Sequence, residues 1–144
     1  MFFSTYPSPS CNGGNYLTAF DSVAAAGGVT YDKAYPYDIN ARKCDTSKND
    51  YPVTVTAYHK VEGKQNMINH VLNGGTLVVA VDASGFGSFK GGIFSNCPAP
   101  TANHAMQIVG VNVEEGYWII RNSWGAQWAE QGFMKLALVC TPLH

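Results

Sequence analysis

The sequence predicts an α+β protein, because a helical pattern lies in its first third and strand patterns fill most of the remainder. Short apolar or alternating segments follow one another at regular spacing after residue 51, with glycine-rich turns between them. Of the 144 residues, 46% are hydrophobic and 13% are charged, which suits a well-buried globular protein. We therefore expect a helical part followed by a larger β part.

One helix is expected in the first third, over residues 15–28. Its apolar side chains recur at helical spacing and share one face: Leu17, Phe20, Val23 and Ala24. We expect this face to pack into a core and the helix to end at the glycine pair 27–28. The preceding "CNGG" at 11–14 is expected to be a flexible turn, and residues 31–50 an ordered loop.

The other two thirds contain the strand signals. Alternation over 51–61 predicts a strand, and residues 64–75 form a short helical pattern closed by two glycines. Further strands are expected at 76–83, 105–111, 116–124 and 132–138, with a glycine- and aromatic-rich segment at 84–97. Their spacing is typical of a twisted antiparallel sheet or small barrel. The change in pattern predicts two lobes that meet near residue 52.

Charge and hydropathy exclude several classes of protein. The net charge of −1 gives no sign of nucleic-acid binding or of contact with an anionic membrane surface. No apolar run is long enough to span a bilayer. Residues 1–10 have neither the basic start nor the apolar stretch of a signal peptide.

Four cysteines are widely and irregularly spaced: Cys11, Cys44, Cys97 and Cys140. No pair has the C-x-x-C spacing, which argues against a zinc site. The cysteines are either buried thiols or partners in long-range disulfides, and the residues alone leave every pairing open.

His104 and Asn122 occupy analogous places, since one opens an expected strand and the other closes one. A histidine at a strand end is partly exposed and can exchange protons, and an asparagine carbonyl can accept its N–H without adding a charge. Trp124, two residues further on, could cover that hydrogen bond. Such a pair suits a thiol nucleophile, because the imidazolium stabilises a thiolate and the neutral amide does not quench the ion pair.

The simpler interpretation of any histidine is a hydrogen-bonded structural residue. We leave His59, His70 and His144 with that interpretation, as surface or terminal residues. For His104 the neighbouring motifs favour a catalytic role.

Six segments occur in one order along the chain: "CNGG" at 11, "YPY" at 35, "GGIF" at 91, "NHAMQIVG" at 103, "YWIIRNSWG" at 117 and "GFMKLAL" at 132. Together they resemble the papain family of cysteine peptidases, which includes the cathepsins. The resemblance implies a two-lobed fold with the active site in the cleft between lobes. It assigns residues 1–51 to a partial helical lobe and residues 52–144 to an antiparallel β-barrel lobe.

The resemblance also implies roles for single residues. His104 matches the catalytic histidine, and Asn122 the residue that orients it. The positions that match substrate-binding sites of the family are Gly13, Gly14, Tyr16, Leu17, Ala80, Ala102, Asn103, Ala105, Trp124 and Trp128. Among them, Ala80, Ala102 and Ala105 match the pocket for the second residue before the cut. Its small walls without a carboxylate favour an apolar side chain such as Leu or Phe.

The nucleophile has no match in this chain. The family carries it in a "CGSCW"-like motif upstream of "CNGG", and nothing similar precedes Cys11. The resemblance implies that Cys97 pairs with Cys140, and that Cys11 and Cys44 bond to the absent segment. It implies no cofactor and no metal. Ala129, in "WAEQG", occupies a position where the family has glycine.

We therefore expect a portion of a papain-like cysteine endopeptidase that hydrolyses peptide bonds with a cysteine supplied by a segment absent from this chain. The isolated chain should then be inactive, and its partners should be a peptide or protein substrate and an N-terminal peptidase portion. The alternative is a non-catalytic peptide-binding or scaffold module. The family and the disulfide pattern imply a lysosomal, vacuolar or secreted location.

Overall fold

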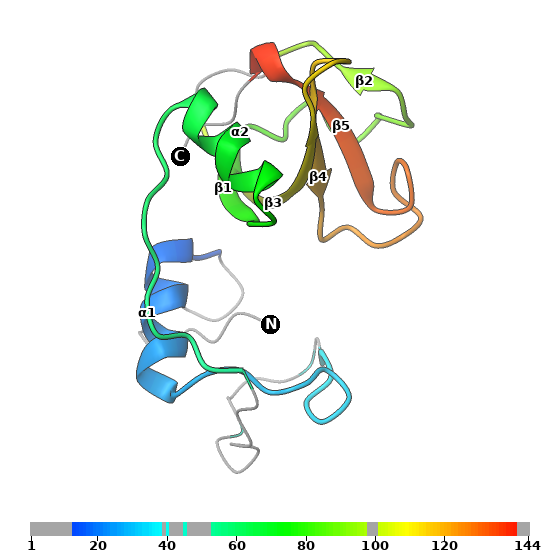
Figure 1. Ribbon diagram of the computed structural model, residues 1–144. Helices are drawn as coiled ribbons and strands as arrows, with labels where there is room; N and C mark the ends of the chain where they lie inside the picture. Colours follow the sequence, from blue (N-terminus) through cyan, green and yellow to red (C-terminus); the bar gives the residue numbers. More distant parts are fainter. Residues whose placement is uncertain (1–12, 39, 41–44, 46–52, 98–100, 141–144) are drawn as a thin grey trace. The chain divides into compact units, whose positions relative to one another are not determined.

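The structure is a computed structural model that describes residues 13–38, 40, 45, 53–97 and 101–140 (Figure 1). The chain divides into two compact units, Met1–His59 and Lys60–His144, and each is described by itself. The assignment of lobes to residues 1–51 and 52–144 stays a prediction. Cys11 and Cys44 lie outside the described residues.

The expected helix of the first unit is present as α1, Tyr16–Ala26. Asn15 caps its start, because the side-chain oxygen accepts a 2.8 Å hydrogen bond from the Leu17 N–H. Gly27 ends it in a left-handed conformation with φ 96°. The N–H groups of Gly27 and Gly28 then bond back to the carbonyls of Ala24 and Val23, which closes the last turn.

The apolar face of α1 is not buried in a core, so that expectation is wrong within the described residues. Leu17 is 45% exposed, and Ser22 is the buried residue of the helix. Phe20 is half-buried and stacks on Tyr58 at 5.4 Å between ring centroids. The reason is that the described part of this unit has no sheet or second helix to cover the face.

The strand expected at 51–61 is also wrong over its described part. Val53 forms a single antiparallel bridge with Val29, and no described strand follows before the next helix, α2 (Lys64–Leu72). This bridge brings backbones very close, because a Cβ on Gly28 would lie 2.2 Å from the Val53 carbonyl oxygen. An alternating segment forms a strand only where another strand can pair with it, and among the described residues the partner is Val29 alone.

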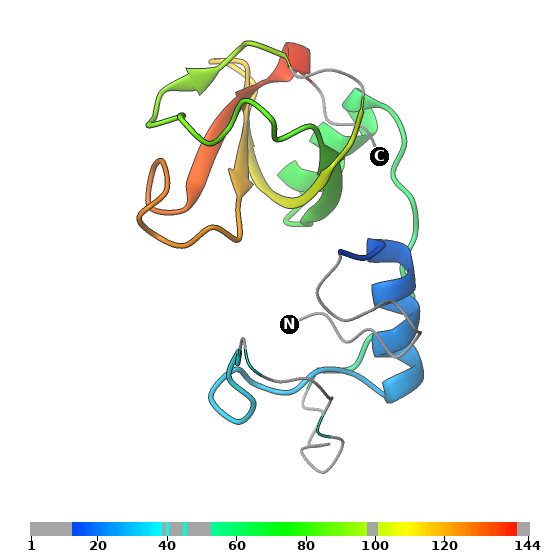
Figure 2. The same ribbon diagram turned by 180° about the vertical axis from the view of Figure 1, so that it is seen from behind.

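The second unit contains one five-stranded sheet. Its strands are β1 (Leu77–Val81), β2 (Ile93–Phe94), β3 (His104–Asn112), β4 (Tyr117–Arg121) and β5 (Phe133–Ala137). Their order is β1-β3-β4-β5-β2, and β2 lies beside β5 in both views of the ribbon (Figures 1 and 2). The four strands expected at 76–83, 105–111, 116–124 and 132–138 are confirmed. The sheet is not wholly antiparallel as expected, because β2 and β5 run parallel.

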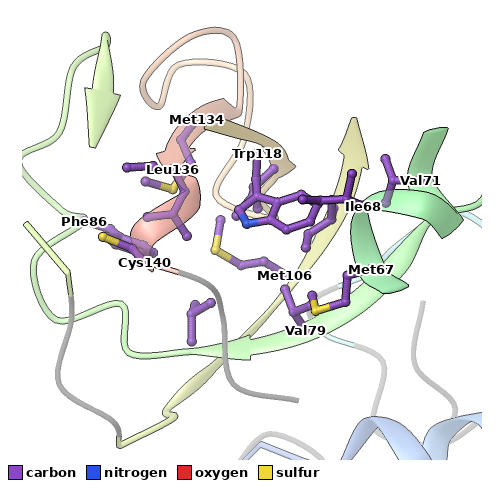
Figure 3. Packing of buried hydrophobic residues seen from close by; sticks show 14 residues of the cluster. Met67, Ile68, Val71, Val79, Phe86, Met106, Trp118, Met134, Leu136 and Cys140 are labelled. Atoms are coloured by element: carbon purple, nitrogen blue, oxygen red, sulfur yellow. The ribbon is translucent and has the colours of Figure 1, made fainter. Parts of the chain in front are cut away.

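A hydrophobic core lies between the sheet and α2 (Lys64–Leu72), which confirms the helix expected at 64–75. The helix contributes Met67, Ile68 and Val71. Figure 3 shows these side chains close to Trp118 of β4, which is fully buried. Burying one such large side chain contributes about 1.5–3 kcal/mol. The core therefore gives the strand ends a rigid support.

A disulfide joins Cys97 to Cys140 at the end of η2 (Leu138–Cys140), with 43 residues of sequence separation. It links the segment after β2 to the segment after β5, at the edge of the sheet where those strands pair. Among the described residues, no helix is long and apolar enough to cross a membrane.

Candidate active site

His104 and Asn122 lie at the same end of two neighbouring strands. His104 is the first residue of β3, and its Cα partner on β1 is Val81. Asn122 follows Arg121, the last residue of β4. Because β3 and β4 pair in antiparallel register up to Gln107 and Arg121, the two side chains meet beyond the last pair.

The two side chains are directly hydrogen-bonded. His104 Nε2 lies 2.8 Å from Asn122 Oδ1. The same Oδ1 accepts a 2.8 Å hydrogen bond from the backbone N–H of Ser123, which identifies this atom as the amide oxygen. An oxygen can only accept, so Nε2 carries the proton and donates it. His104 Nδ1 is then the ring nitrogen that can exchange protons with a substrate or a nucleophile.

Asn122 is itself held by the turn that precedes β5. Its backbone N–H donates to the Gly132 carbonyl at 2.9 Å. Its side-chain nitrogen Nδ2 is buried and has no hydrogen-bond partner in the described part of the chain. Leaving a buried donor unpaired costs free energy. The amide is therefore oriented by what its oxygen binds, the His104 ring and the Ser123 N–H.

Trp124 covers the imidazole. The ring centroids of Trp124 and His104 are 5.1 Å apart, with 32° between the planes. Trp128 meets Trp124 edge-on at 5.2 Å and 82°, and its indole N–H donates to the Phe86 carbonyl at 3.1 Å. This contact fixes Trp128 against the segment after β1. The Trp124 indole thus lies against the imidazole on one side, while it is itself 42% exposed.

Ala80 and Ala105 face each other across β1 and β3 as Cα partners. Their neighbours Val79 and Met106 are buried in the core, so the two alanines project from the other face of the sheet. Ala80 is half-buried and Ala105 is exposed. Ala102 and Asn103 are exposed just before β3.

The remaining predicted substrate-binding residues belong to the first unit. Gly13 and Gly14 are exposed, and a Cβ on either would meet no atom within 4 Å. Gly13 has φ +91°, which glycine adopts without strain. Tyr16 is half-buried and Leu17 is exposed at the start of α1.

Several residues around the histidine were not predicted from the sequence. The side chains of Asp82 and Ser84 bind Asn103, the neighbour of His104. An Asp followed two residues later by Ser, directly after a strand, is a turn signal that could have identified them. The Ser123 N–H and the Phe86 carbonyl are backbone groups, so the residue types at these positions could not predict their hydrogen bonds. No group of three or more His, Cys, Asp or Glu in the described part is placed to hold a metal ion.

An imidazole that is oriented by a neutral amide and covered by an indole is the arrangement expected beside a thiol nucleophile. The fold and the site thus indicate the class of cysteine peptidases. Residues 4–140 match the family model described as papain family cysteine protease. The chain belongs to this family, and its α+β fold is papain-like.

Two curated relatives illustrate the similarity. The chain is 37% identical to the KDEL-tailed cysteine endopeptidase CEP2 of Arabidopsis thaliana, over 92% of this chain and 38% of that protein. It is 35% identical to the viral cathepsin of Choristoneura fumiferana nuclear polyhedrosis virus, over 88% of this chain and 40% of that protein. The chain thus spans about 40% of the length of these relatives.

Solved structures agree in fold. Bromelain from Ananas comosus in complex with the E64 inhibitor matches with a TM-score of 0.78 and 32% identity, over 88% of this chain and 61% of that one. The recombinant stem bromelain precursor matches with a TM-score of 0.81 and 31% identity, over 92% and 46%. A procathepsin L2 from Tenebrio molitor matches with a TM-score of 0.78 and 33% identity, over 91% and 44%.

Proposed function

We propose that this chain is the histidine-bearing portion of a papain-like cysteine endopeptidase, which cleaves peptide bonds with a thiol supplied by a segment outside these 144 residues. The observation that carries this proposal is the 2.8 Å contact between His104 Nε2 and Asn122 Oδ1 beneath Trp124. It supplies a base with a fixed tautomer and a free Nδ1. Membership of the papain family supports the reaction type.

The reaction proceeds by four proton transfers at His104 Nδ1, two in acylation and two in deacylation. This nitrogen takes the proton of the thiol, and the thiolate attacks the scissile carbonyl. The imidazolium then protonates the leaving amine as the C–N bond breaks, which leaves a thioester. A water molecule next gives a proton to Nδ1 and attacks the thioester, and the proton returns to sulfur as the acid product leaves. Asn122 keeps the ring in one orientation throughout.

The thiol is assigned to another segment because the structure or the family resemblance gives each cysteine of this chain another role. Cys97 and Cys140 are bonded to each other. Cys11 and Cys44 match family positions that form disulfides with the nucleophile-bearing segment. The curated relatives are more than twice as long as the matched region. An N-terminal peptidase portion is therefore the proposed partner of this chain.

The proposed substrate is a peptide or protein with an apolar residue two positions before the cut. Ala80 and Ala105 support this preference, because they are small, uncharged residues paired across β1 and β3. Ala102 is proposed to line the same pocket, and Asn103, Tyr16 and Leu17 are proposed as further substrate-binding residues. Gly13 and Gly14 are proposed to pair with the substrate main chain, and Trp124 and Trp128 to flank the residues after the cut.

We propose that the protein works in a lysosome, a vacuole or outside the cell. The Cys97–Cys140 disulfide supports an oxidising compartment. One relative is named as KDEL-tailed and another as a viral cathepsin, which agrees with the secretory route.

The catalytic test is to produce this chain together with the nucleophile-bearing portion and to measure hydrolysis of a fluorogenic peptide with Leu or Phe two positions before the cut. His104→Ala should lower kcat by about 10²–10⁴-fold, because the acid–base group is lost. Asn122→Ala should cause a smaller loss. His59→Ala, which removes an exposed histidine of the first unit, is the matched control. Full activity of His104→Ala would show that the proposed base is wrong.

The source of the thiol is tested separately, by intact mass with and without reductant and by labelling with E64. The proposal expects a disulfide-linked partner that separates on reduction and carries the label. A label on this chain would overturn the assignment of the thiol. If the wild-type assembly binds peptides but neither cleaves them nor takes the label, the protein is a non-catalytic peptide-binding module.

A further inference from the structure

His104 is restrained unequally by its two neighbouring strands. On the β1 side, Val81 is its direct Cα partner, and the preceding N–H of Asn103 donates to the Val81 carbonyl at 2.9 Å. On the β4 side, the last registered pair is Gln107 with Arg121, three residues further along β3. The position of the His104 backbone therefore depends on how firmly the end of β1 is held to the start of β3.

A cluster of three side chains closes this end: Asp82, Ser84 and Asn103. Asn103 Oδ1 accepts a hydrogen bond from the Ala83 N–H at 2.9 Å, and Asn103 Nδ2 donates to Asp82 Oδ1 at 2.8 Å. Ser84 donates to the same Asp82 oxygen from its N–H at 3.0 Å and from its hydroxyl at 2.5 Å. Asn103 Nδ2 also reaches Ser84 Oγ at 3.2 Å.

The arrangement of hydrogen-bond donors and acceptors in the cluster restricts which side chain can occupy position 103. Asp82 as a carboxylate can only accept, so the atom of residue 103 that faces it must donate. The Ala83 N–H can only donate, so the other atom of residue 103 must accept. A short side chain that donates on one side and accepts on the other is asparagine. The bonds thus hold the amide in one orientation, one residue before His104.

We propose that Asp82, Ser84 and Asn103 form a positioning cluster for His104, in which Asp82 selects a neutral amide at position 103. The cluster holds the turn after β1 to the start of β3, and so keeps the imidazole within reach of Asn122. The catalytic part of this inference rests on the proposed function. Within segments 79–84 and 101–106, Asp82 and His104 are the two titratable residues.

The decisive variant is Asn103→Asp, which changes one atom of the side chain. It places a second carboxylate at a position that lies 2.8 Å from Asp82 in the native protein. Two carboxylates at this distance cannot both be ionised without strong repulsion. Above the pH at which the pair loses its shared proton, the turn should separate from β3.

The exchanged variant Asp82→Asn/Asn103→Asp restores the hydrogen bond between positions 82 and 103 with the charge moved. The amide nitrogen introduced at position 82 can donate to the carboxylate introduced at position 103 and to the Ser84 hydroxyl oxygen, whereas the Ser84 N–H, which donates to the same atom of Asp82 in the native protein, loses that acceptor. That carboxylate can in turn accept from the Ala83 N–H. The matched control is Asn112→Asp at the far end of β3. Asn112 Nδ2 donates to Glu115 Oε1 at 2.8 Å, so this variant also creates a carboxylate pair, but away from His104.

Two readouts are measured in the 144-residue chain by NMR against pH: hydrogen exchange of the Ala83 amide, and the signal of the His104 Nε2 proton bound to Asn122. Asn103→Asp should lose both near neutral pH and regain them on acidification. The exchanged variant and the Asn112→Asp control should keep both. These readouts need no catalysis, so they test positioning even if the peptidase proposal fails.

In the assembled peptidase, Asn103→Asp should lower kcat roughly tenfold or more, because small displacements of a catalytic base are costly. The exchanged variant should recover to within about threefold of wild type, as expected for two coupled sites. Wild-type NMR behaviour of Asn103→Asp, or failure of the exchange to rescue it, would overturn the positioning role. An equal loss in Asn112→Asp would do the same.

Discussion

At the scale of single residues, the turn before β5 contains two residues other than glycine whose backbone lies in the left-handed region. Ala129 has φ 44° and Gln131 has φ 55°. Each such residue costs roughly 1–2 kcal/mol. The turn contributes Trp128, which packs against Trp124, and the Gly132 carbonyl, which binds the Asn122 N–H. The site therefore depends on a turn whose sequence opposes its conformation.

Replacing Ala129 by glycine should relieve this conflict. We expect Ala129→Gly to raise the free energy of unfolding by about 1 kcal/mol, measured by urea denaturation. The control is Ala126→Gly in the same turn, where φ is not positive. There glycine only adds freedom to the unfolded chain and should destabilise by about 0.4–1 kcal/mol. Equal signs for the two variants would contradict the argument.

At the scale of elements, one carboxylate joins this turn to the segment before β2. Glu130 Oε1 accepts from the Gly92 N–H at 2.9 Å, and Lys135 of β5 lies 3.4 Å from Glu130 Oε2. The Gly92 N–H holds the pKa of Glu130 below its ordinary value of 4.5, with a smaller contribution from Lys135, while burial acts in the opposite direction. The link ties two loops to one edge of the sheet.

Stability should therefore depend on the ionisation of Glu130. Because its pKa is lower in the folded state, the contribution is complete above the unfolded pKa and disappears as the pH falls through the folded pKa. Glu130→Gln should lower stability at neutral pH by at most about 0.5 kcal/mol, since the pair is partly exposed. It should also flatten the acid side of the curve of unfolding free energy against pH.

The control for this variant is Glu114→Gln, which removes the same charge from the exposed turn after β3. Unfolding curves are compared across the acidic range for both variants and the wild type. If Glu130→Gln and Glu114→Gln have the same acid slope, the hydrogen bond to Gly92 is not the cause.

At the scale of the whole molecule, the second unit combines a packed core with a covalent link. Trp118, Ile108 and Ile120 are fully buried, in the same core cluster as the buried side chains of α2. The Cys97–Cys140 disulfide closes a loop of 43 residues that includes β3, β4 and β5. Because the loop contains both His104 and Asn122, the link stabilises the unit that positions the candidate site.

Removing this disulfide should destabilise the second unit. A loop of this length restricts the unfolded chain, so Cys97→Ala/Cys140→Ala should lower the free energy of unfolding by about 3–4 kcal/mol. The measurement is denaturant unfolding followed by the fluorescence of Trp118, with Trp124 and Trp128 replaced by Phe in both proteins. An unchanged denaturant midpoint would show that removing the disulfide does not increase the conformational entropy of the unfolded chain.

Local patterns in the sequence were sufficient for much of the fold. Helical spacing predicts α1 and α2, and apolar runs between turn residues predict β1, β3, β4 and β5. His104 and Asn122 were identified because each lies at an end of a strand that its own neighbours define. These features depend on residues close together in the chain, so their signals can be read in order.

Tertiary structure decided the features that depend on a distant partner. The alternation at 51–61 found a partner only at Val29 among the described residues, and β2 pairs in parallel with β5. The apolar face of α1 is only partly covered within the described part of its unit, where Phe20 stacks on Tyr58 and Leu17 is exposed. The Asp82 cluster and the Phe86 carbonyl that holds Trp128 join segments far apart in sequence. Periodicity shows which face of an element is apolar, but the identity of its neighbour depends on long-range packing and hydrogen bonding, which only the folded chain establishes.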